Sequence, residues 1–222
     1  MSLAEAIDQL GDLAAEIKRE AFTDDKTSLG GPLALLQEQR LHRILQADVQ
    51  IVVFGDLNNF KHINDDYSHD AGDVALRAVG DTLRRIVIDT LKAKAFRRSG
   101  DEFVIILNED SLSDFLAALP SFFNIPFSHN KRELSTSMSF GYAIDDGKAS
   151  FDELIRRADA ASQIAKRPGA GTCVEWTENI ELNPLVRIGG WCPECNAKIS
   201  CTLPRENLPP KLLSCPCCGT SL

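Results

Sequence analysis

The sequence predicts a mixed α+β domain with helices packed over a mostly antiparallel sheet, followed by a small cysteine-rich segment. Helical and strand-like segments alternate along most of the chain, and residues 94–108 have the pattern of two short strands joined by a tight turn. A hairpin pairs its strands antiparallel, which disfavours a doubly wound parallel sheet. Six of the seven cysteines lie in the last 31 residues, which sets that segment apart.

Composition limits the class of protein. The 222 residues are enough for one domain of about 150 residues and a small appendage. The chain has no apolar run long enough to span a membrane and no signal-peptide pattern at its start, so we expect a cytoplasmic protein without membrane contact. A net charge of −8 disfavours nucleic acid as a general partner.

The N-terminal segment 1–21 is predicted to be a helix, mainly residues 2–21. Apolar residues recur along it at spacings of three and four: Leu3, Ile7, Leu10, Ala14 and Ile17. Such a stripe is explained either by packing of the helix on its own domain or by a short dimer seam, although it is shorter than a coiled coil needs.

The main domain is predicted over residues 22–178, with a linker at 179–190 and the cysteine-rich segment at 191–222. Periodicity, capping residues and Pro-Gly stops define its elements. After a loop at 22–32 we expect a helix at 33–46, a strand at 49–56, helices at 58–65 and 73–90, the hairpin at 94–108, a helix at 111–122, a strand at 134–144, a helix at 152–166 and a strand at 172–176.

Acidic side chains stand at the ends of two predicted strands. Asp56 ends the apolar strand 49–56, and Asp101 and Glu102 lie at the tip of the hairpin beside a glycine. Carboxylates brought together in this way form an oxygen site for Mg²⁺. With a bound nucleoside triphosphate, such a site supports phosphoryl transfer.

Over roughly residues 20–178 the chain resembles the GGDEF domain, the diguanylate cyclase family, because several motifs occur in the same order as in that family. The hairpin tip is similar to the signature that gives the family its name, and the other segments follow at the family's spacing. The segments are Asp56 to Asp65, Ser68 to Asp73, Ser99 to Phe103, Ser139 to Gly141, and Ala158-Asp159 through Ala165-Lys166.

The resemblance implies a palm-like α+β fold related to nucleotide cyclases and a role in bacterial signalling. Members of the family condense two GTP molecules into cyclic di-GMP and release pyrophosphate. Each subunit holds one GTP, so the resemblance also implies a homodimer during catalysis.

The resemblance also assigns roles to the acidic residues. Asp56 and Asp101, with the carbonyl of Leu57, would hold Mg²⁺ or Mn²⁺. Asp101 would also help to deprotonate the 3′-hydroxyl, and Glu102 would join the metal site or orient the reacting sugar.

Substrate-binding residues follow in the same way. Asn64 and Asp73 match the family's guanine-reading pair, because a carboxylate accepts hydrogen bonds from N1–H and the exocyclic amine of guanine. Lys166 matches a lysine that reaches the terminal phosphates. The backbone N–H groups of residues 58–61, which include Phe60 and Lys61, would also cradle the phosphates.

The chain departs from the family pattern at several positions. Ser99 replaces a glycine and would cost more than glycine at a positive φ, and Asn58 replaces an aspartate. Ala170 replaces an arginine that contacts phosphate, which predicts weaker GTP binding. The family's product-inhibition motif is replaced by Thr90 to Ala93, so we expect no feedback binding there. Further departures are Lys26, Gly31 and Pro32 in the first loop, and Ser162 and Gln163.

These departures leave a second hypothesis open, a GTP-binding or cyclic di-GMP-binding regulator with weak or no turnover. In that case the cysteine-rich segment would be the output module. A third hypothesis is a nucleic-acid adaptor that acts through the same segment.

The cysteines predict a structural Zn²⁺ site in a zinc ribbon. Cys192 and Cys195 form one pair and Cys215 and Cys218 another, with nineteen residues between the pairs. Four thiolates leave no open position on the metal, so this zinc would be structural. Cys201 and Cys217 would then be spare, and pairing Cys217 with Cys215 or with Cys218 is an alternative of poorer geometry. Because basic residues are few in this segment, we expect the ribbon to contact a protein partner.

Overall fold

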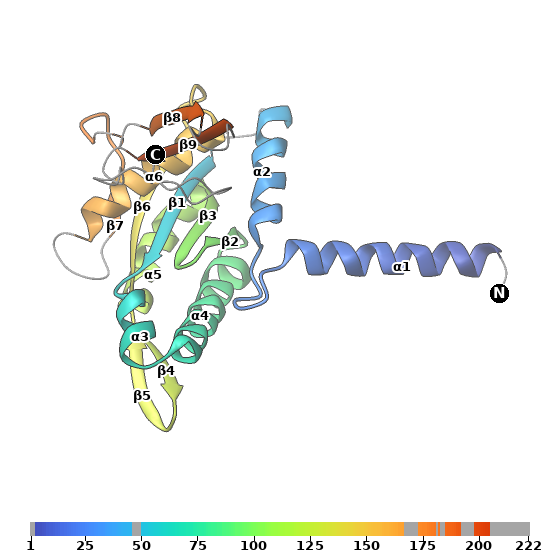
Figure 1. Ribbon diagram of the computed structural model, residues 1–222, viewed down its shortest axis with the longest axis horizontal. Coiled ribbons are helices and arrows are strands. Elements are labelled where there is room, and N and C mark those ends of the chain that lie inside the picture. The colour runs from blue at the N-terminus through green and yellow to red at the C-terminus, as the bar shows by residue number, and fades with distance from the viewer. Residues whose placement is uncertain are drawn as a thin grey trace. The chain divides into compact units, whose positions relative to one another are not determined.

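The structure is a computed structural model that describes residues 3–45, 50–166, 173–180, 182, 185–191 and 198–204. The chain divides into two compact units, Met1–Ile180 and Glu181–Leu222. Figure 1 shows the elements of the first unit, and its helices include a π-helical turn, η1, and two 3₁₀ turns, η2 and η3. The helical elements are α1 (Leu3–Phe22), α2 (Pro32–Leu45), α3 (Phe60–Asp66), α4 (His69–Leu83), η1 (Arg84–Thr90), η2 (Glu109–Ser111), α5 (Leu112–Ala118), η3 (Leu119–Phe122) and α6 (Phe151–Ala165). The strands are β1 (Gln50–Leu57), β2 (Lys94–Ser99), β3 (Glu102–Asn108), β4 (Ile125–His129), β5 (Arg132–Thr136), β6 (Met138–Ile144) and β7 (Cys173–Glu175).

Five of these strands form a central sheet in the order β2-β3-β1-β6-β7. Strand β1 pairs antiparallel with β3 and β6, and β2 pairs antiparallel with β3, whereas β7 is parallel to β6. Every residue of β1 after Gln50 is buried, as expected for a central strand covered on both faces. The predicted α+β class with a mostly antiparallel sheet is therefore confirmed.

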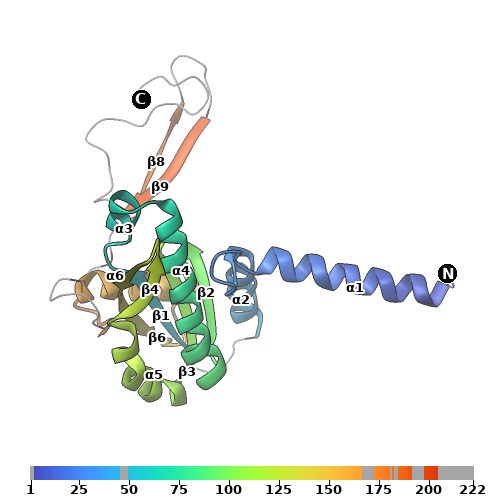
Figure 2. The ribbon, with the colours of Figure 1, turned by 90° about the horizontal axis from the view of Figure 1, so that it is seen from below.

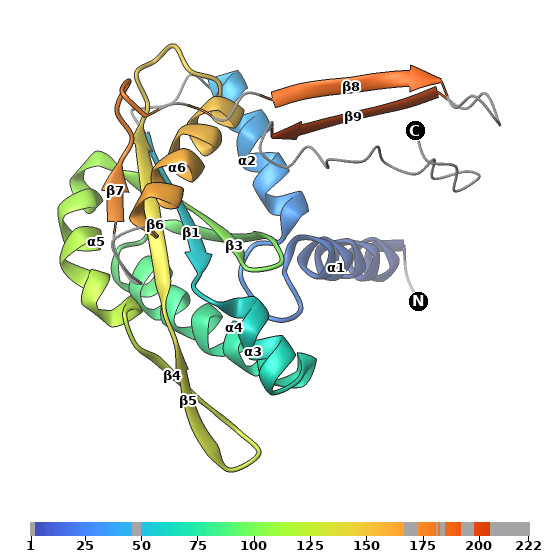
Figure 3. The same ribbon diagram turned by 60° about the vertical axis from the view of Figure 1, so that its left-hand side comes forward.

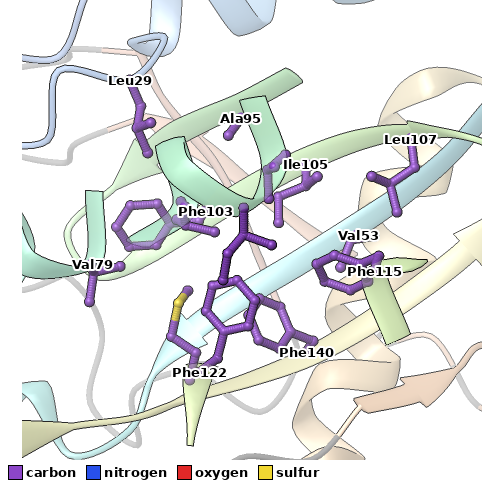
Figure 4. Close-up of a cluster of buried hydrophobic side chains, with 14 of the residues drawn as sticks. Leu29, Val53, Val79, Ala95, Phe103, Ile105, Leu107, Phe115, Phe122 and Phe140 are labelled. Atoms are coloured by element: carbon purple, nitrogen blue, oxygen red, sulfur yellow. The ribbon is translucent and has the colours of Figure 1, made fainter. Parts of the chain in front are cut away.

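One face of the sheet is covered by α4, η1, α5 and η3 (Figure 2). Alternate residues of β1 and β3 enter this core because side chains of a strand point to opposite faces in turn. Three phenylalanines pack together there, with the ring of Phe115 edge-on to that of Phe140 at a centroid distance of 5.5 Å (Figure 4). Phe122 lies against both rings.

The opposite face is covered by α2 and α6, and α6 runs beside β6 (Figure 3). Val52, Phe54 and Val104 from the strands pack here against α6. A glycine in β6 allows the close approach, since a Cβ at Gly141 would lie 2.2 Å from both the Ala158 carbonyl oxygen and the Ser162 nitrogen. The next side chain of β1 on this face is Asp56, so its carboxylate points toward α6.

Helix α1 exposes Leu10, Ala14 and Ile17 of the apolar stripe predicted for it. Leu10, Leu13 and Ile17 are 67%, 51% and 56% exposed, and all residues from 9 to 21 are exposed. Packing of this helix on its own domain therefore does not explain the stripe.

Two predicted elements of the first unit have different bounds. The helix expected over 73–90 begins at His69, because the Ser68 hydroxyl caps it by accepting a hydrogen bond from the Ala71 N–H at 3.2 Å. The strand expected over 134–144 is two strands, β5 and β6, separated at Ser137. Strand β4, which we did not predict, pairs with β5 in a hairpin whose Phe127 packs against the start of α4.

The second unit contains an antiparallel pair of strands, β8 (Leu185–Trp191) and β9 (Lys198–Pro204). Strand β8 occupies most of the interval expected to be a linker at 179–190, so that expectation was wrong for residues 185–190. The apolar residues Leu185, Val186 and Ile188 favour a strand there. Cys192, Cys195, Cys215, Cys217 and Cys218 lie outside the described residues.

Within the described ranges, no helix combines the length and apolar character that crossing a membrane requires.

We predict that Gly141→Ala destabilises the domain by at least about 2 kcal/mol, because the new methyl group would overlap the backbone of α6. Urea unfolding followed by circular dichroism measures this change. Gly11→Ala is the matched control, since nothing lies within 4 Å of its Cβ position, and it should change the free energy of unfolding by less than about 1 kcal/mol. Equal effects of the two substitutions would contradict the close packing of α6 on β6.

Candidate functional site

The sheet brings the predicted acidic residues to one edge. Asp56 near the end of β1 lies opposite Glu102 at the start of β3 in the antiparallel register. The Leu57 N–H donates a hydrogen bond to the Asp101 carbonyl oxygen at 3.2 Å, which fixes the hairpin tip beside the end of β1. Asp56, Leu57, Asp101 and Glu102 are therefore gathered as the sequence predicted.

Lys166 supplies positive charge to this edge. It follows the last residue of α6, and its Nζ lies 2.8 Å from Asp56 Oδ1. Burial raises the pKa of Asp56, and the Lys166 ammonium opposes this shift while the charges of Asp101 and Glu102 add to it. The carboxylate of Asp56, with the residue only 9% exposed, thus lies in a site that attracts cations.

Asp159 belongs to the same neighbourhood, although the sequence analysis did not include it among the site residues. Burial raises its pKa, and the charge of Glu102 raises it further, while Arg98 and Lys166 act in the opposite direction. Its carboxylate accepts a hydrogen bond from Gln163 Nε2 at 3.3 Å. Asp159 precedes Lys166 by seven residues on α6, and this spacing of two helical turns was the signal that could have identified it.

The turn at the hairpin tip accommodates Ser99 without a left-handed backbone. Among the described residues the positive φ values of this turn are confined to Gly100, at 44°. The conformational cost expected for Ser99 is therefore absent. Its hydroxyl instead donates to Glu102 Oε2 at 2.7 Å, and Arg98 Nη1 lies 3.4 Å from the same oxygen, so both hold the Glu102 carboxylate.

Asn58 joins the end of β1 to β6 through both atoms of its amide. Its Nδ2 donates to Ser137 Oγ at 3.0 Å, and its Oδ1 accepts from Ser139 Oγ at 2.9 Å. The asparagine amide thus offers a donor to one serine hydroxyl and an acceptor to the other. The backbone N–H of Asn58 donates to the Ser137 carbonyl at 2.8 Å, so the predicted phosphate cradle is reduced to residues 59–61, which include Phe60 and Lys61.

The predicted base readers, Asn64 of α3 and Asp73 of α4, lie on neighbouring helices that pack together. A Cβ at Gly72 would lie 2.0 Å from Asn64 Oδ1, so the Asn64 amide rests on the helix turn that carries Asp73. Lys26, from the loop between α1 and α2, forms an ion pair with the Asp73 carboxylate. The sequence analysis noted Lys26 only as a departure from the family pattern.

The loop that carries Lys26 is also bonded to the hairpin. Arg97 Nη1 lies 3.1 Å from Asp24 Oδ2, and its Nε donates to the Gly100 carbonyl at 2.9 Å. Asp24 Oδ1 in turn accepts from the backbone N–H and the hydroxyl of Thr27 at 2.8 and 2.7 Å. The hairpin tip, the loop and helix α4 are therefore connected by one series of side-chain bonds.

The described part of the chain contains no group of three or more histidine, cysteine or acidic side chains placed to hold a metal ion. At the acidic edge the partners of the carboxylates are Lys166 for Asp56 and Ser99 with Arg98 for Glu102. The four cysteines predicted to bind zinc, Cys192, Cys195, Cys215 and Cys218, fall outside the described residues.

The sequence is similar to known proteins of one family. A family model described as diguanylate cyclase, GGDEF domain, matches residues 21–172. Diguanylate cyclase DgcN of Escherichia coli (strain K12) is 35% identical over 163 residues, which are 70% of this chain and 40% of DgcN. The chain thus spans well under half the length of that curated relative.

Solved structures show the same fold. The coiled coil and GGDEF domain of DgcB from Caulobacter crescentus, in complex with c-di-GMP, gives a TM-score of 0.67 at 21% identity and covers 78% of this chain and 94% of that one. The GGDEF domain of PA1120 from Pseudomonas aeruginosa gives a TM-score of 0.58 at 28% identity, covering 71% and 95%.

We predict that Asp24 stabilises the fold in a pH-dependent way. Burial alone would raise the pKa of Asp24, but the hydrogen bonds from Thr27 and the charge of Arg97 lower it below its ordinary value. A lowered folded-state pKa means that the stabilisation is complete above the unfolded-state pKa of about 3.9 and is lost as the pH falls through the folded-state value.

Asp24→Asn should therefore lower the free energy of unfolding by about 1–3 kcal/mol at pH 7, with the difference constant down to about pH 5 and smaller below about pH 4. Urea unfolding at a series of pH values measures it. Asp114→Asn, at an exposed position of α5, should have little effect at neutral pH. A difference for Asp24→Asn that persisted undiminished at pH 3 would refute the assignment.

Proposed function

Because this chain belongs to the diguanylate cyclase GGDEF family, we propose that it condenses two GTP molecules into cyclic di-GMP and pyrophosphate. The observation that carries the proposal is the acidic edge of the sheet, where Asp56, Asp101 and Glu102 lie together beside Lys166. The two predicted base readers on α3 and α4 complete a site with separate places for phosphates and for a guanine base.

Asp56 and Asp101, with the Leu57 carbonyl, would hold Mg²⁺ or Mn²⁺. These residues suit such an ion, since Mg²⁺ in nucleotide sites is held by one or two carboxylates together with waters and substrate phosphates. Burial raises the pKa of Asp56 because it disfavours the negative charge, and this supports the proposal of an added positive charge there. When bound, the metal neutralises charge on the phosphates and helps the pyrophosphate to leave.

The chain's own residues then have distinct tasks. Asp101 accepts the proton of the attacking 3′-hydroxyl, and Glu102, held by Ser99 and Arg98, orients the sugar or joins the metal site. Lys166 moves from Asp56 to the terminal phosphates when nucleotide binds, because a side chain that is 32% exposed can change partners at small cost. The N–H groups of residues 59–61 add phosphate contacts.

Guanine is read by Asn64 and Asp73. The Asp73 carboxylate accepts hydrogen bonds from N1–H and the 2-amino group, two donors that adenine does not present at these positions. Adenine would leave the carboxylate unpaired, and a site built on such contacts discriminates strongly.

Two copies of the chain must meet, since each site holds one GTP and the product joins two. We propose a homodimer, and the exposed apolar side chains of Leu10, Leu13 and Ile17 on α1 form the surface that supports it. The turnover rate per mole of protein should consequently rise with protein concentration until dimers dominate.

The second candidate is a regulator that binds GTP or cyclic di-GMP without turnover. One observation favours it: Asp56 and Glu102 already have cationic partners in Lys166 and Arg98. An assay of cyclic di-GMP formation from GTP separates the two candidates, because only the cyclase forms product.

We predict that purified protein with GTP and Mg²⁺ forms cyclic di-GMP, detected by mass spectrometry, and that Asp101→Asn lowers the rate at least about 100-fold because it removes both a metal ligand and a base. Asp110→Asn, in η2 and outside the site, is the control and should keep the rate. Bound GTP with no product at any protein concentration would replace the cyclase with the regulator.

For the second unit we propose one structural Zn²⁺ held by Cys192, Cys195, Cys215 and Cys218, with a protein as the partner of the resulting zinc ribbon. The six residues 192–197 join the paired strands β8 and β9, and a knuckle between two antiparallel strands is compatible with a ribbon.

Elemental analysis should give about one zinc per chain, and Cys195→Ser should remove it, because three thiolates hold zinc more weakly than four. Cys201→Ser is the matched control in β9 and should keep the metal. Retention of zinc by the first variant and loss by the second would overturn the assignment of ligands.

A further inference from the structure

Lys26 is the least expected residue near the base readers. It comes from the loop between α1 and α2, and its Nζ donates to Asp73 Oδ2 across 47 positions of sequence. The two side chains are 37% and 32% exposed, so both remain accessible to a ligand.

The backbone on either side of Lys26 is fixed, so its place beside Asp73 is set by the fold. Thr27 is only 2% exposed and bonded to Asp24, and Arg84 of η1 donates to the carbonyl oxygens of Thr27 and Ser28 at 3.1 and 3.2 Å. A Cβ at Gly80 would lie 2.6 Å from the Thr27 carbonyl oxygen, which shows how closely the loop rests on α4.

Lys26 and Asp73 together present a hydrogen-bonding pattern that matches guanine. Along its Watson–Crick edge guanine offers an acceptor, O6, followed by two donors, N1–H and the 2-amino group. The lysine ammonium offers a donor and the adjacent carboxylate offers two acceptors, in the complementary order. Adenine places an amine donor where guanine has O6, so its amine would face the ammonium.

We propose that Lys26 is a specificity-determining residue that donates a hydrogen bond to O6 of guanine from beside Asp73. This inference rests on the proposed GTP site and adds a third reader to Asn64 and Asp73. The hydrogen bond and charge of Asp73 raise the pKa of Lys26, so the side chain is a cation at neutral pH. An accessible ion pair contributes little to stability, so Lys26 can adjust toward the base at small cost.

The test is equilibrium binding of 3′-deoxynucleoside triphosphates, which lack the attacking hydroxyl and therefore bind without reacting. Four bases separate the contacts. Guanine has all three groups, hypoxanthine keeps O6 and N1–H, 2-aminopurine keeps only the 2-amino group, and adenine lacks all three. Competition against a fluorescent guanine nucleotide gives the four dissociation constants for each variant.

Lys26→Met removes the donor and keeps the length of the side chain. It should weaken binding of the guanine and hypoxanthine nucleotides by the same factor, about ten-fold or more, and change binding of the 2-aminopurine nucleotide less than about two-fold. Lys26→Arg keeps a donor and should retain most of the preference for O6. Lys148→Met, at an exposed turn away from the site, should leave all four constants unchanged.

Other outcomes overturn the proposal in recognisable ways. Equal weakening of all four nucleotides by Lys26→Met would show that Lys26 only holds the loop, and tighter guanine binding would show that it competes with the base for Asp73. Wild-type protein that binds guanine and adenine nucleotides equally, or binds neither, would refute the proposed GTP site itself. A selective wild type that is unaffected by Lys26→Met would refute the role of Lys26 alone.

Discussion

The antiparallel register of β1 with β3 is the constraint on which the candidate site depends. It sets Asp56 opposite Glu102, and the Leu57 N–H bonds to the carbonyl of Asp101, so three acidic residues from two distant segments meet at one edge. A shift by one residue would turn Asp56 to the other face of the sheet, toward the core under α4, because strand side chains alternate. Such a shift is opposed because it would bury the Asp56 carboxylate among apolar side chains.

Packing on the α6 side converts this edge into a charged site. Gly141 lets the α6 backbone approach β6, and the helix then carries Lys166 to Asp56 and Asp159 to the neighbourhood of Glu102. Burial of Asp56 disfavours its negative charge, and the Lys166 ammonium opposes that effect. The same features that raise the pKa of Asp56 support the proposal that this edge binds a metal–nucleotide complex, which would bring positive charge and new partners for Lys166.

Departures from the family pattern are accompanied by local compensation in this chain. Ser99 bonds to Glu102 and leaves the left-handed position to Gly100, while Asn58 uses both ends of its amide on Ser137 and Ser139. Lys26 is placed on α4 by a loop that Asp24 and Arg97 bond to the hairpin tip. Asp73, the proposed base reader, and the acidic edge are thereby connected through side-chain bonds as well as through the sheet.

The sequence by itself determined the α+β class, the hairpin, the strand ends that carry Asp56 and Asp101, and the family, because these depend on local periodicity and on motifs in a fixed order. It misjudged the start of α4, the β4–β5 hairpin and β8, where a serine cap and short strands of weak periodicity decide the bounds. Only the tertiary structure decided that Lys166 pairs with Asp56, that Asp159 joins the site and that Lys26 meets Asp73. These contacts join residues far apart in the chain, and their geometry depends on strand order and on how closely the helices and the Lys26 loop pack, which local sequence patterns do not encode.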